Sequence, residues 1–255
     1  FVYIQTKLAQ KGIAIVTDCD LGGEVWTARP PMPQGQVAVF GKSGSTLADT
    51  LLWFRDQMRR LDVGAFVVTT LDDIAWLLNI RGSDIDYNPV VVSYLYVAHD
   101  RAVLFVDDRK LNNATKRYFA HNGIEIADYG VFFDFLHSVG GQTVGVDFRK
   151  ANYEVFKALS VGNSPKDIAL PTTEAKAVKN AVELAGFRRA MVKDGVALVR
   201  FFMWLDSAVA KGEATELTAS AMLHRCRCRQ AGFVGESFET IAAYETHGAI
   251  VHYSP

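Results

Sequence analysis

Residues 65–79, with the sequence AFVVTTLDDIAWLLN, join an apolar strand to a helix and decide the fold class. Residues 65–69 are a short run of apolar and β-branched side chains, which is typical of a buried strand. Thr70 and Asp73 have the spacing of a capping box in its aspartate form, and this predicts a helix over 71–79. A strand that leads directly into a helix indicates a layered α/β domain.

The same alternation of strands and helices extends from residue 36 to residue 170. Thr46 is a candidate cap for a helix whose apolar positions recur at helical spacing as far as Leu61. We expect further strands at 90–98, 102–107, 124–127 and 143–147, and further helices at 111–121, 131–139 and 153–161. His99-Asp100-Arg101 forms the turn of a hairpin, so the predicted sheet is mixed rather than entirely parallel.

The two ends of the chain differ in character from this α/β region. Residues 1–35 predict a helix that ends near Gly12, a strand at 13–17, and a linker broken by the prolines of 29–33. Residues 171–255 predict helices at 178–210 and 216–230, the second capped by Thr215, and then strands at 237–244 and 249–253. We therefore expect three parts: 1–35, the end of a preceding domain with its linker; 36–170, a middle α/β domain; and 171–255, the start of a third domain.

Composition excludes several classes of function. The formal net charge is −1, so no overall field favours nucleic acid or an anionic membrane surface. The longest nearly uncharged apolar run, residues 89–98, is too short to span a bilayer, and no basic-then-apolar leader opens the chain. Three cysteines give no disulfide framework, which favours a reducing, cytoplasmic location. Phe1 and Pro255 do not resemble natural termini, so we expect a fragment of a longer chain.

Motifs that carry chemistry are scarce. Residues 41–44, GKSG, lack the upstream glycine of a phosphate-binding loop and predict a turn. Cys226 and Cys228 are separated by one residue, which is too few for a structural zinc site, and predict a helix face with one cysteine partly buried. The basic residues of 224–229 predict a solvated helix face.

His252 is the one residue that stands out as a candidate for chemistry. It lies in the strand pattern AIVHY of residues 249–253, on the same face as Ile250. On these residues alone, a core or hairpin histidine with a satisfied hydrogen bond explains the pattern, because one histidine defines no reaction.

Three stretches resemble a known family. Residues 72–85, DDIAWLLNIRGSDI, are similar to the middle domain of the large, three-domain type of aminopeptidase P. Residues 175–180, AKAVKN, and the helix that follows are similar to the entry helix of that family's catalytic domain. Residues 237–241, SFETI, and 248–255, GAIVHYSP, resemble the strand pair ahead of its metal centre. The resemblance covers about residues 60–95 and 172–255, in the order found in the family.

The resemblance implies a fold and an activity. Residues 36–170 would form a mixed-sheet, creatinase N-terminal-like α/β domain, and 171–255 the first part of a "pita-bread" domain. Members of the family release the N-terminal residue from peptides that carry proline in second position, using two divalent ions, usually manganese. The family's metal ligands all follow the position that matches Pro255, so we assign no metal residues and expect no metal in these 255 residues. Related enzymes are often homodimers.

The resemblance also names candidate site residues. His252 matches the family's histidine that forms hydrogen bonds with the substrate or the reaction intermediate, and Arg81 and Asn88 lie in a loop that faces the cleft. His247 stands where relatives carry a Gly-Pro-Asn-like turn, and we interpret it as a loop residue. Two alternatives stay open: a non-catalytic pita-bread binding module, and a prolidase- or creatinase-type hydrolase.

Overall fold

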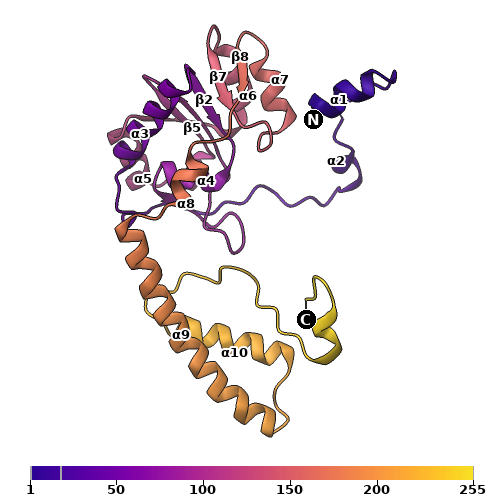
Figure 1. Ribbon diagram of the computed structural model, residues 1–255, viewed down its shortest axis with the longest axis vertical. Helices are drawn as coiled ribbons and strands as arrows, with labels where there is room; N and C mark the ends of the chain where they lie inside the picture. The colour runs from indigo at the N-terminus through magenta and orange to yellow at the C-terminus, as the bar shows by residue number, and fades with distance from the viewer. Residues whose placement is uncertain (1, 18, 255) are drawn as a thin grey trace.

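A mixed six-stranded sheet forms the centre of the molecule (Figure 1). The computed structural model describes residues 2–17 and 19–254. The strands are β2 (Ala65–Val68), β4 (Tyr94–Ala98), β5 (Ala102–Phe105), β6 (Ile124–Ala127), β7 (Thr143–Val146) and β8 (Ser164–Asp167), in the spatial order β6-β5-β4-β2-β7-β8. The expected α/β class and mixed sheet are confirmed, because β2 pairs antiparallel with β4 and parallel with β7.

The predicted hairpin forms as expected. Of the six strands in this sheet only the last was missed, and the short separate pair at 38–39 and 80–81 was missed as well. β4 and β5 pair antiparallel, with Val97 opposite Ala102, so the intervening turn lies at 99–101. β6 and β8 extend the two ends of the sheet in parallel with β5 and β7. β8 contains Pro165 and is mostly polar, so its sequence lacks the apolar pattern that predicts a strand. Proline is tolerated there because β8 is an edge strand.

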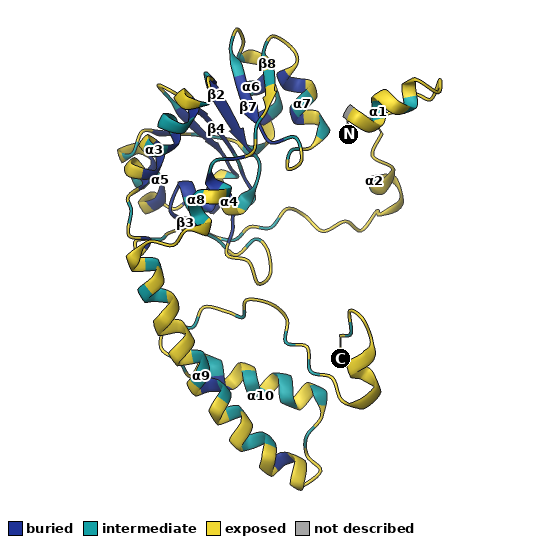
Figure 2. Cartoon of the chain, viewed as in Figure 1, coloured by how far each residue is buried: buried dark blue, intermediate teal, exposed yellow. Residues whose placement is uncertain are grey.

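Helices cover both faces of the sheet (Figure 2). They are α3 (Leu47–Arg60), α4 (Leu71–Leu77), α5 (Asn113–His121), α6 (Phe132–Ser138) and α7 (Tyr153–Leu159). Phe66 and Val68 of β2 pack in one core with α3, α4 and α5, whereas Ala65 and Val67 pack in a second core with α6 and α7. This alternation follows from the two-residue period of a strand, and it makes β2 buried on both sides.

The helix starts in this region have different caps. Thr46 and Asp49 form the full capping box of α3. Thr70 makes no side-chain cap bond at α4, so the predicted capping box is wrong there. The reason is that the Asp73 carboxylate accepts hydrogen bonds from the Thr70 hydroxyl and from Lys176 Nζ instead of from the helix backbone.

The N-terminal segment lies away from the sheet and reaches it through an extended linker (Figure 1). It holds α1 (Val2–Ala9) and α2 (Leu21–Val25), and the linker ends in β1 (Ala38–Val39), which pairs with β3 (Ile80–Arg81). The strand predicted at 13–17 is wrong: the segment has no regular structure, and Ile13 and Val16 are exposed. A strand needs a neighbour for its backbone groups, and no strand in the described part of the chain pairs with this segment.

Beyond β8 the chain becomes helical. A short α8 (Thr172–Ala177) precedes α9 (Ala181–Ala210), which leads away from the α/β layers, and α10 (Glu216–Cys228) packs along it (Figure 1). Asn180 and Glu183 form a capping box on α9, and the predicted Thr215 cap of α10 is confirmed.

The two strands predicted near the C-terminus, 237–244 and 249–253, are wrong. The described part of this segment holds a short 3₁₀ helix, η3 (Glu245–Ala249), and otherwise irregular chain. Ile241, Ile250 and Val251 are exposed by 64%, 52% and 81%. A two-stranded ribbon is marginal in water without a third strand or a helix to cover its apolar face, so the alternating pattern alone does not make a sheet here.

Candidate functional site

The structure places Arg81 in a supporting position. It lies at the end of β3, with its guanidinium 4.3 Å from the centre of the Phe40 ring. Nη1 donates hydrogen bonds to the carbonyl oxygens of Ile80 and Ala75, at 2.8 and 3.2 Å. Burial lowers the pKa of Arg81, against the opposing charge of Glu183. These contacts hold the base of the loop that follows β3.

Asn88 lies further along that loop, residues 82–92, and is exposed. Its backbone N–H donates to the carbonyl oxygen of Ile85 at 3.2 Å, which closes a tight turn. Tyr87 within the turn has φ +62° and is half exposed. The loop therefore presents a short run of polar and aromatic side chains to solvent from a fixed base.

The base of the loop is fixed by a buried ion pair that the sequence did not reveal. Lys110 Nζ lies 2.6 Å from Asp84 Oδ2. The same carboxylate accepts the backbone N–H of Val92 at 2.7 Å and that of Gly35 at 3.1 Å. Asp84 thereby joins both sides of the loop to the linker. A pair separated by 26 positions and drawn from two irregular segments gives no local signal.

The linker lies against the 3₁₀ helix η1 (Asp108–Lys110) that follows β5. Gln34 Nε2 donates to Asp107 Oδ2 at 3.0 Å, and Gln36 Nε2 donates to the carbonyl oxygen of Arg109 at 3.0 Å. The pKa of the Asp107 carboxyl is held well below its usual range by the hydrogen bonds from Arg109 and Gln34. These hydrogen bonds hold the linker in a defined position against η1.

A second buried carboxylate ties α8 to α4. Asp73 accepts from Lys176 Nζ at 2.8 Å, and Lys150 Nζ lies 3.8 Å from its other oxygen. Asp72 pairs with the same Lys176. Burial opposes ionisation of Asp73, yet the hydrogen bonds from Lys176 and Thr70 prevail and lower the pKa of Asp73.

The turn at 41–44 contacts the start of α9. The prediction of a turn there is confirmed, since residues 41–45 are turn and bend. Asn180 Nδ2 donates to the carbonyl oxygen of Ser43 at 2.7 Å. Gly44 has φ +79°, and a Cβ built on it would lie 2.8 Å from Val182 Cβ, so only glycine fits. The Gly-Lys-Ser triplet serves this contact between α9 and the α/β layers.

His252 lies in the C-terminal segment and is exposed. The expected strand geometry is absent: its φ is +58°, in the left-handed region, so it does not share a sheet face with Ile250. The structure does not bring His252 into contact with Arg81 or Asn88 through any hydrogen bond or ion pair that it records among the described residues.

Glu216, at the first position of α10, accepts hydrogen bonds from several residues close to His252 in the sequence. It accepts the Tyr253 hydroxyl at 2.6 Å, the Tyr244 backbone N–H at 2.6 Å, and His247 Nδ1 at 3.0 Å. The hydrogen bond from Tyr253 is the largest cause that lowers the pKa of Glu216, and the same bond raises the pKa of Tyr253. His247 lies in η3, so the expected loop residue is an anchor for this turn.

The described residues hold no group of three or more His, Cys, Asp or Glu side chains arranged to bind a metal ion. The donors present therefore do not fit a two-metal centre. Nor does any helix in the described part of the chain combine the length and apolar character needed to cross a membrane.

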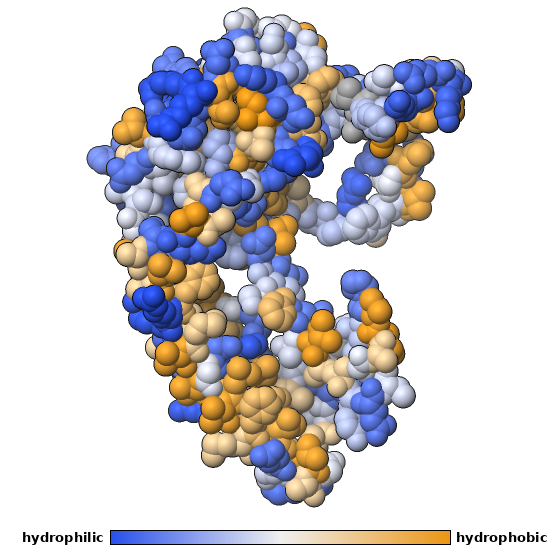
Figure 3. Space-filling model, in the orientation of Figure 1, coloured by the Kyte–Doolittle hydropathy of each residue, from blue (hydrophilic) through white to orange (hydrophobic). Residues whose placement is uncertain are grey.

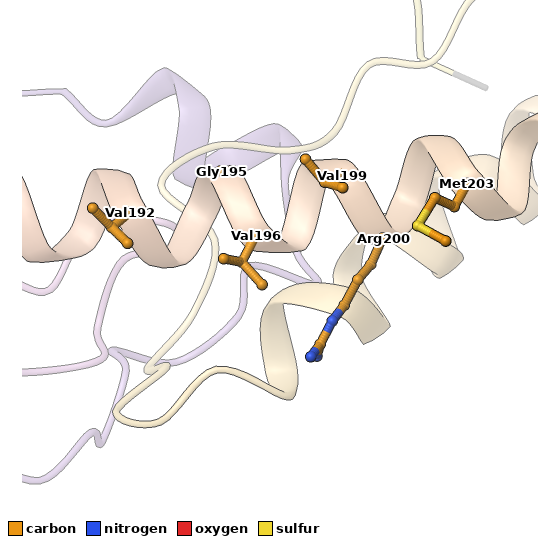
Figure 4. A pocket seen from close by; sticks show the side chains of 6 residues that line it. All are labelled: Val192, Gly195, Val196, Val199, Arg200 and Met203. Carbon is orange, nitrogen blue, oxygen red and sulfur yellow. The ribbon is translucent and has the colours of Figure 1, made fainter.

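Apolar surface gathers over the helical part instead (Figure 3). A hollow of about 550 Å³ runs along α9 (Figure 4); it is lined by Val192, Gly195, Val196, Val199, Arg200 and Met203. Val192 and Met203 are 69% and 71% exposed. Exposed apolar patches of this kind mark interaction surfaces, and this hollow lacks the convergent polar groups of a substrate site.

Comparison with known proteins establishes the family. Residues 28–183 match the family model of the creatinase/prolidase N-terminal domain, and residues 185–255 match that of metallopeptidase family M24. The first match covers more than half of the chain, so the chain belongs to the creatinase/prolidase N-terminal domain family. The resemblance to this family and the expected fold class are confirmed.

Relatives refine this assignment. The chain is 39% identical over 246 residues to a probable Xaa-Pro aminopeptidase P of Neurospora crassa, with 91% of this chain and 36% of the relative covered. It is 37% identical over 264 residues to the probable Xaa-Pro aminopeptidase P of Sordaria macrospora, with 98% and 43% covered. The chain spans about two fifths of the length of these relatives.

Solved structures agree. The X-prolyl aminopeptidase of Caenorhabditis elegans, described as a cytosolic enzyme with a di-nuclear active site, superposes with a TM-score of 0.92 at 30% identity, over 100% of this chain and 43% of that one. The Xaa-Pro dipeptidase of Bacillus anthracis superposes with a TM-score of 0.52 at 14% identity, over 72% of this chain and 50% of that one, which shows a shared fold alone.

Proposed function

We propose that this chain is the middle and early catalytic part of a metal-dependent Xaa-Pro aminopeptidase. The observation that carries the proposal is the superposition of the whole chain on the Caenorhabditis elegans enzyme at 30% identity. The domain division follows: 1–35 ends a preceding domain, 36–170 is the creatinase-like middle domain, and 171–255 begins the pita-bread domain. A cytosolic location is proposed with it, since that neighbour is described as a cytosolic enzyme.

The proposed substrate explains why a dedicated enzyme is needed. The bond before proline is a tertiary amide without an N–H, and the ring fixes φ near −65°. Peptidases that recognise an extended N–H-bearing amide therefore bind it poorly. The substrate class is a peptide with proline in second position.

The residues of this chain take supporting roles in the proposal. His252 would donate a hydrogen bond to the substrate carbonyl or to the oxyanion derived from it. Arg81 and Asn88 would act through the 82–92 loop, Arg81 by fixing its base and Asn88 by facing the peptide. Two divalent ions, manganese in our proposal, belong to the complete enzyme, with their ligands outside these 255 residues.

The exposed face of α9 supports the idea that more of the domain covers it. Val192, Val196 and Val199 are 69%, 41% and 60% exposed, which is unusual for the apolar stripe of a finished domain. We propose that the remainder of the metallopeptidase domain packs on this stripe, and that the complete enzyme forms a homodimer.

Hydrolysis by the full-length protein tests the proposal. Purified full-length protein with manganese is offered paired peptides that carry proline or alanine in second position. Release of the first residue from the proline peptide, and not from the alanine peptide, is the expected result. The 255-residue chain is the control and is expected to be inactive. If the full-length protein binds proline peptides without cleaving them, the non-catalytic module is the better description; cleavage of Xaa-Pro dipeptides alone favours a prolidase.

A further inference from the structure

Three side chains near the end of α10 form a relay that the proposed peptidase chemistry does not use. Cys228 Sγ lies 3.2 Å from His224 Nε2, one helical turn away. His224 Nδ1 lies 3.1 Å from Glu236 Oε1, on the chain that returns after α10. A nucleophile, a base and a group that orients the base stand in that order, which is the arrangement of activated thiols.

The relay has a defined tautomer. Glu236 also accepts Arg227 Nη1 at 2.7 Å, and Arg227 bridges to Asp194 of α9. Two donors thus converge on the Glu236 carboxylate, and the imidazole donates to it through Nδ1–H. The lone pair of Nε2 then faces the Cys228 thiol. The edge of Phe233, at 5.7 Å between ring centres, restrains the imidazole ring further.

Exposure separates this cysteine from its neighbour. Cys228 is exposed, whereas Cys226, two residues before it, is 3% exposed and buried. The Arg227 guanidinium of the basic run is paired with Asp194 and Glu236. Cys228 is the last residue of α10, where the helix C-terminus disfavours a negative charge, so the activation of its thiol depends on His224.

We propose that Cys228 is a reactive thiol that exchanges with low-molecular-weight disulfides, with His224 as its base. The thiol proton moves to His224 Nε2, and Sγ attacks one sulfur of the disulfide. A new bond joins Cys228 Sγ to that sulfur as the original S–S bond breaks. The departing thiolate takes the proton from the imidazolium. Cys228 is oxidised to a mixed disulfide and the departing sulfur is reduced, so no further oxidant is needed.

The modification would change the surface of α10 without requiring a binding pocket, because Cys228 lies on open helix surface. It removes the thiol from His224 and adds bulk beside the contact between Arg227 and Asp194. The proposal is independent of the peptidase function, since it rests on α10, the chain after it and the contact of Arg227 with Asp194 of α9.

Site-resolved thiol exchange tests the proposal on the purified full-length protein. Oxidised glutathione is added at pH 7, and mixed disulfides at Cys19, Cys226 and Cys228 are followed by peptide mass spectrometry. Cys19 is an exposed internal control whose sequence neighbours, Asp18 and Asp20, are acidic. Cys228 is expected to react at least about tenfold faster than Cys19, because His224 Nε2 lies 3.2 Å from its Sγ and can accept the thiol proton. Glutathione release by a C228S variant is expected to fall to the Cys19 rate.

Two variants separate activation from mere exposure. His224→Ala is expected to slow Cys228 by about tenfold, because the thiol loses the base that accepts its proton. His121→Ala, an exposed histidine on α5, leaves the rate unchanged. Far-ultraviolet circular dichroism confirms that α10 persists in each variant. Equal rates at Cys228 and Cys19, or a Cys228 rate that His224→Ala leaves unaltered while α10 remains folded, would overturn the proposal.

Discussion

Lys110 Nζ lies 2.6 Å from Asp84 Oδ2, and both side chains are at most 1% exposed. This pair connects the 82–92 loop, the linker and η1, so three irregular segments depend on one buried interaction. Because an unpaired charge is costly in a buried site, the pair makes the loop a rigid part of the α/β layers rather than a mobile lid.

Removal of one partner of this pair is expected to destabilise the fold strongly. Asp84→Ala leaves Lys110 buried without a counter-charge and frees two backbone amides, so the free energy of unfolding should fall by about 3–5 kcal/mol. Urea denaturation followed by tryptophan fluorescence measures this. Glu125→Ala, which breaks the exposed pair with Arg101, is the matched control and should cost no more than about 1 kcal/mol. A loss for Asp84→Ala as small as the control's would contradict the assigned role.

Asp73 is expected to make stability depend on pH. Its folded-state pKa is lowered below the ordinary 3.8, chiefly by Lys176 and Thr70 acting against burial. A carboxyl with a depressed folded pKa contributes stability that is fully present above the unfolded value and is lost as pH falls through the folded value. Unfolding free energy should therefore decline below about pH 4, and Asp73→Asn should flatten that decline. A slope unchanged by the substitution would assign the effect to other carboxyls.

Gly44→Ala tests the contact between the 41–44 turn and α9. The substitution imposes a Cβ at φ +79°, 2.8 Å from Val182 Cβ, so a loss of about 1–2 kcal/mol is expected from backbone strain alone. Gly41→Ala is the control in the same turn, because a Cβ there meets nothing within 4 Å. Thermal unfolding of both variants decides between a specific contact and a general effect of alanine in the turn.

Glu216 is expected to hold the turn at 244–253. In Glu216→Ala, the Tyr244 amide loses its 2.6 Å acceptor, so its hydrogen exchange should accelerate to the rate of an unprotected amide. Glu213→Ala, an exposed neighbour, should leave that rate unchanged. Protection that survives the loss of Glu216 would show that other contacts order the turn.

His252→Ala in the full-length protein tests its proposed substrate role. We expect kcat/KM for a proline peptide to fall by about 100-fold, with circular dichroism unchanged, because a lost hydrogen bond to a developing oxyanion acts on the transition state. His121→Ala on α5 is the matched histidine control. Wild-type kinetics in His252→Ala would remove His252 from the site while leaving the peptidase proposal intact.

The sequence predicted the sheet well and the C-terminal segment poorly, for physical reasons. The run at 65–69 can be recognised as a strand from its own residues, because a strand buried on both faces must be apolar throughout. β8 has no such pattern, since an edge strand is stabilised by its neighbour's backbone rather than by its own side chains. Residues 249–253 have a strand pattern but no partner strand in the structure, and alternation is not sufficient for pairing.

The candidate site was predictable only where a motif carried it. His252 stood out by its place in an apolar pattern, but its proposed substrate role, like the candidacy of Arg81 and Asn88, came from resemblance to a family. Asp84 and Lys110, which fix the loop, were not predicted. A contact between positions 84 and 110 produces no periodic pattern in the sequence. The Cys228–His224 contact lies at helical spacing and was accessible in principle; Glu236, which completes it, lies beyond the end of the helix.

The anchoring of α9 through Asn180 and Ser43 gives the helix the character of a lever. With 30 residues it is about 45 Å long, held at one end by the 41–44 turn. A tilt of about 5° at the anchor displaces the far end by about 4 Å, which is more than the length of a hydrogen bond. The direction of α9 over tens of ångströms is thus set by a few atoms at its anchor. Substitutions at Asn180 would shift the position of α10 although Asn180 does not contact it.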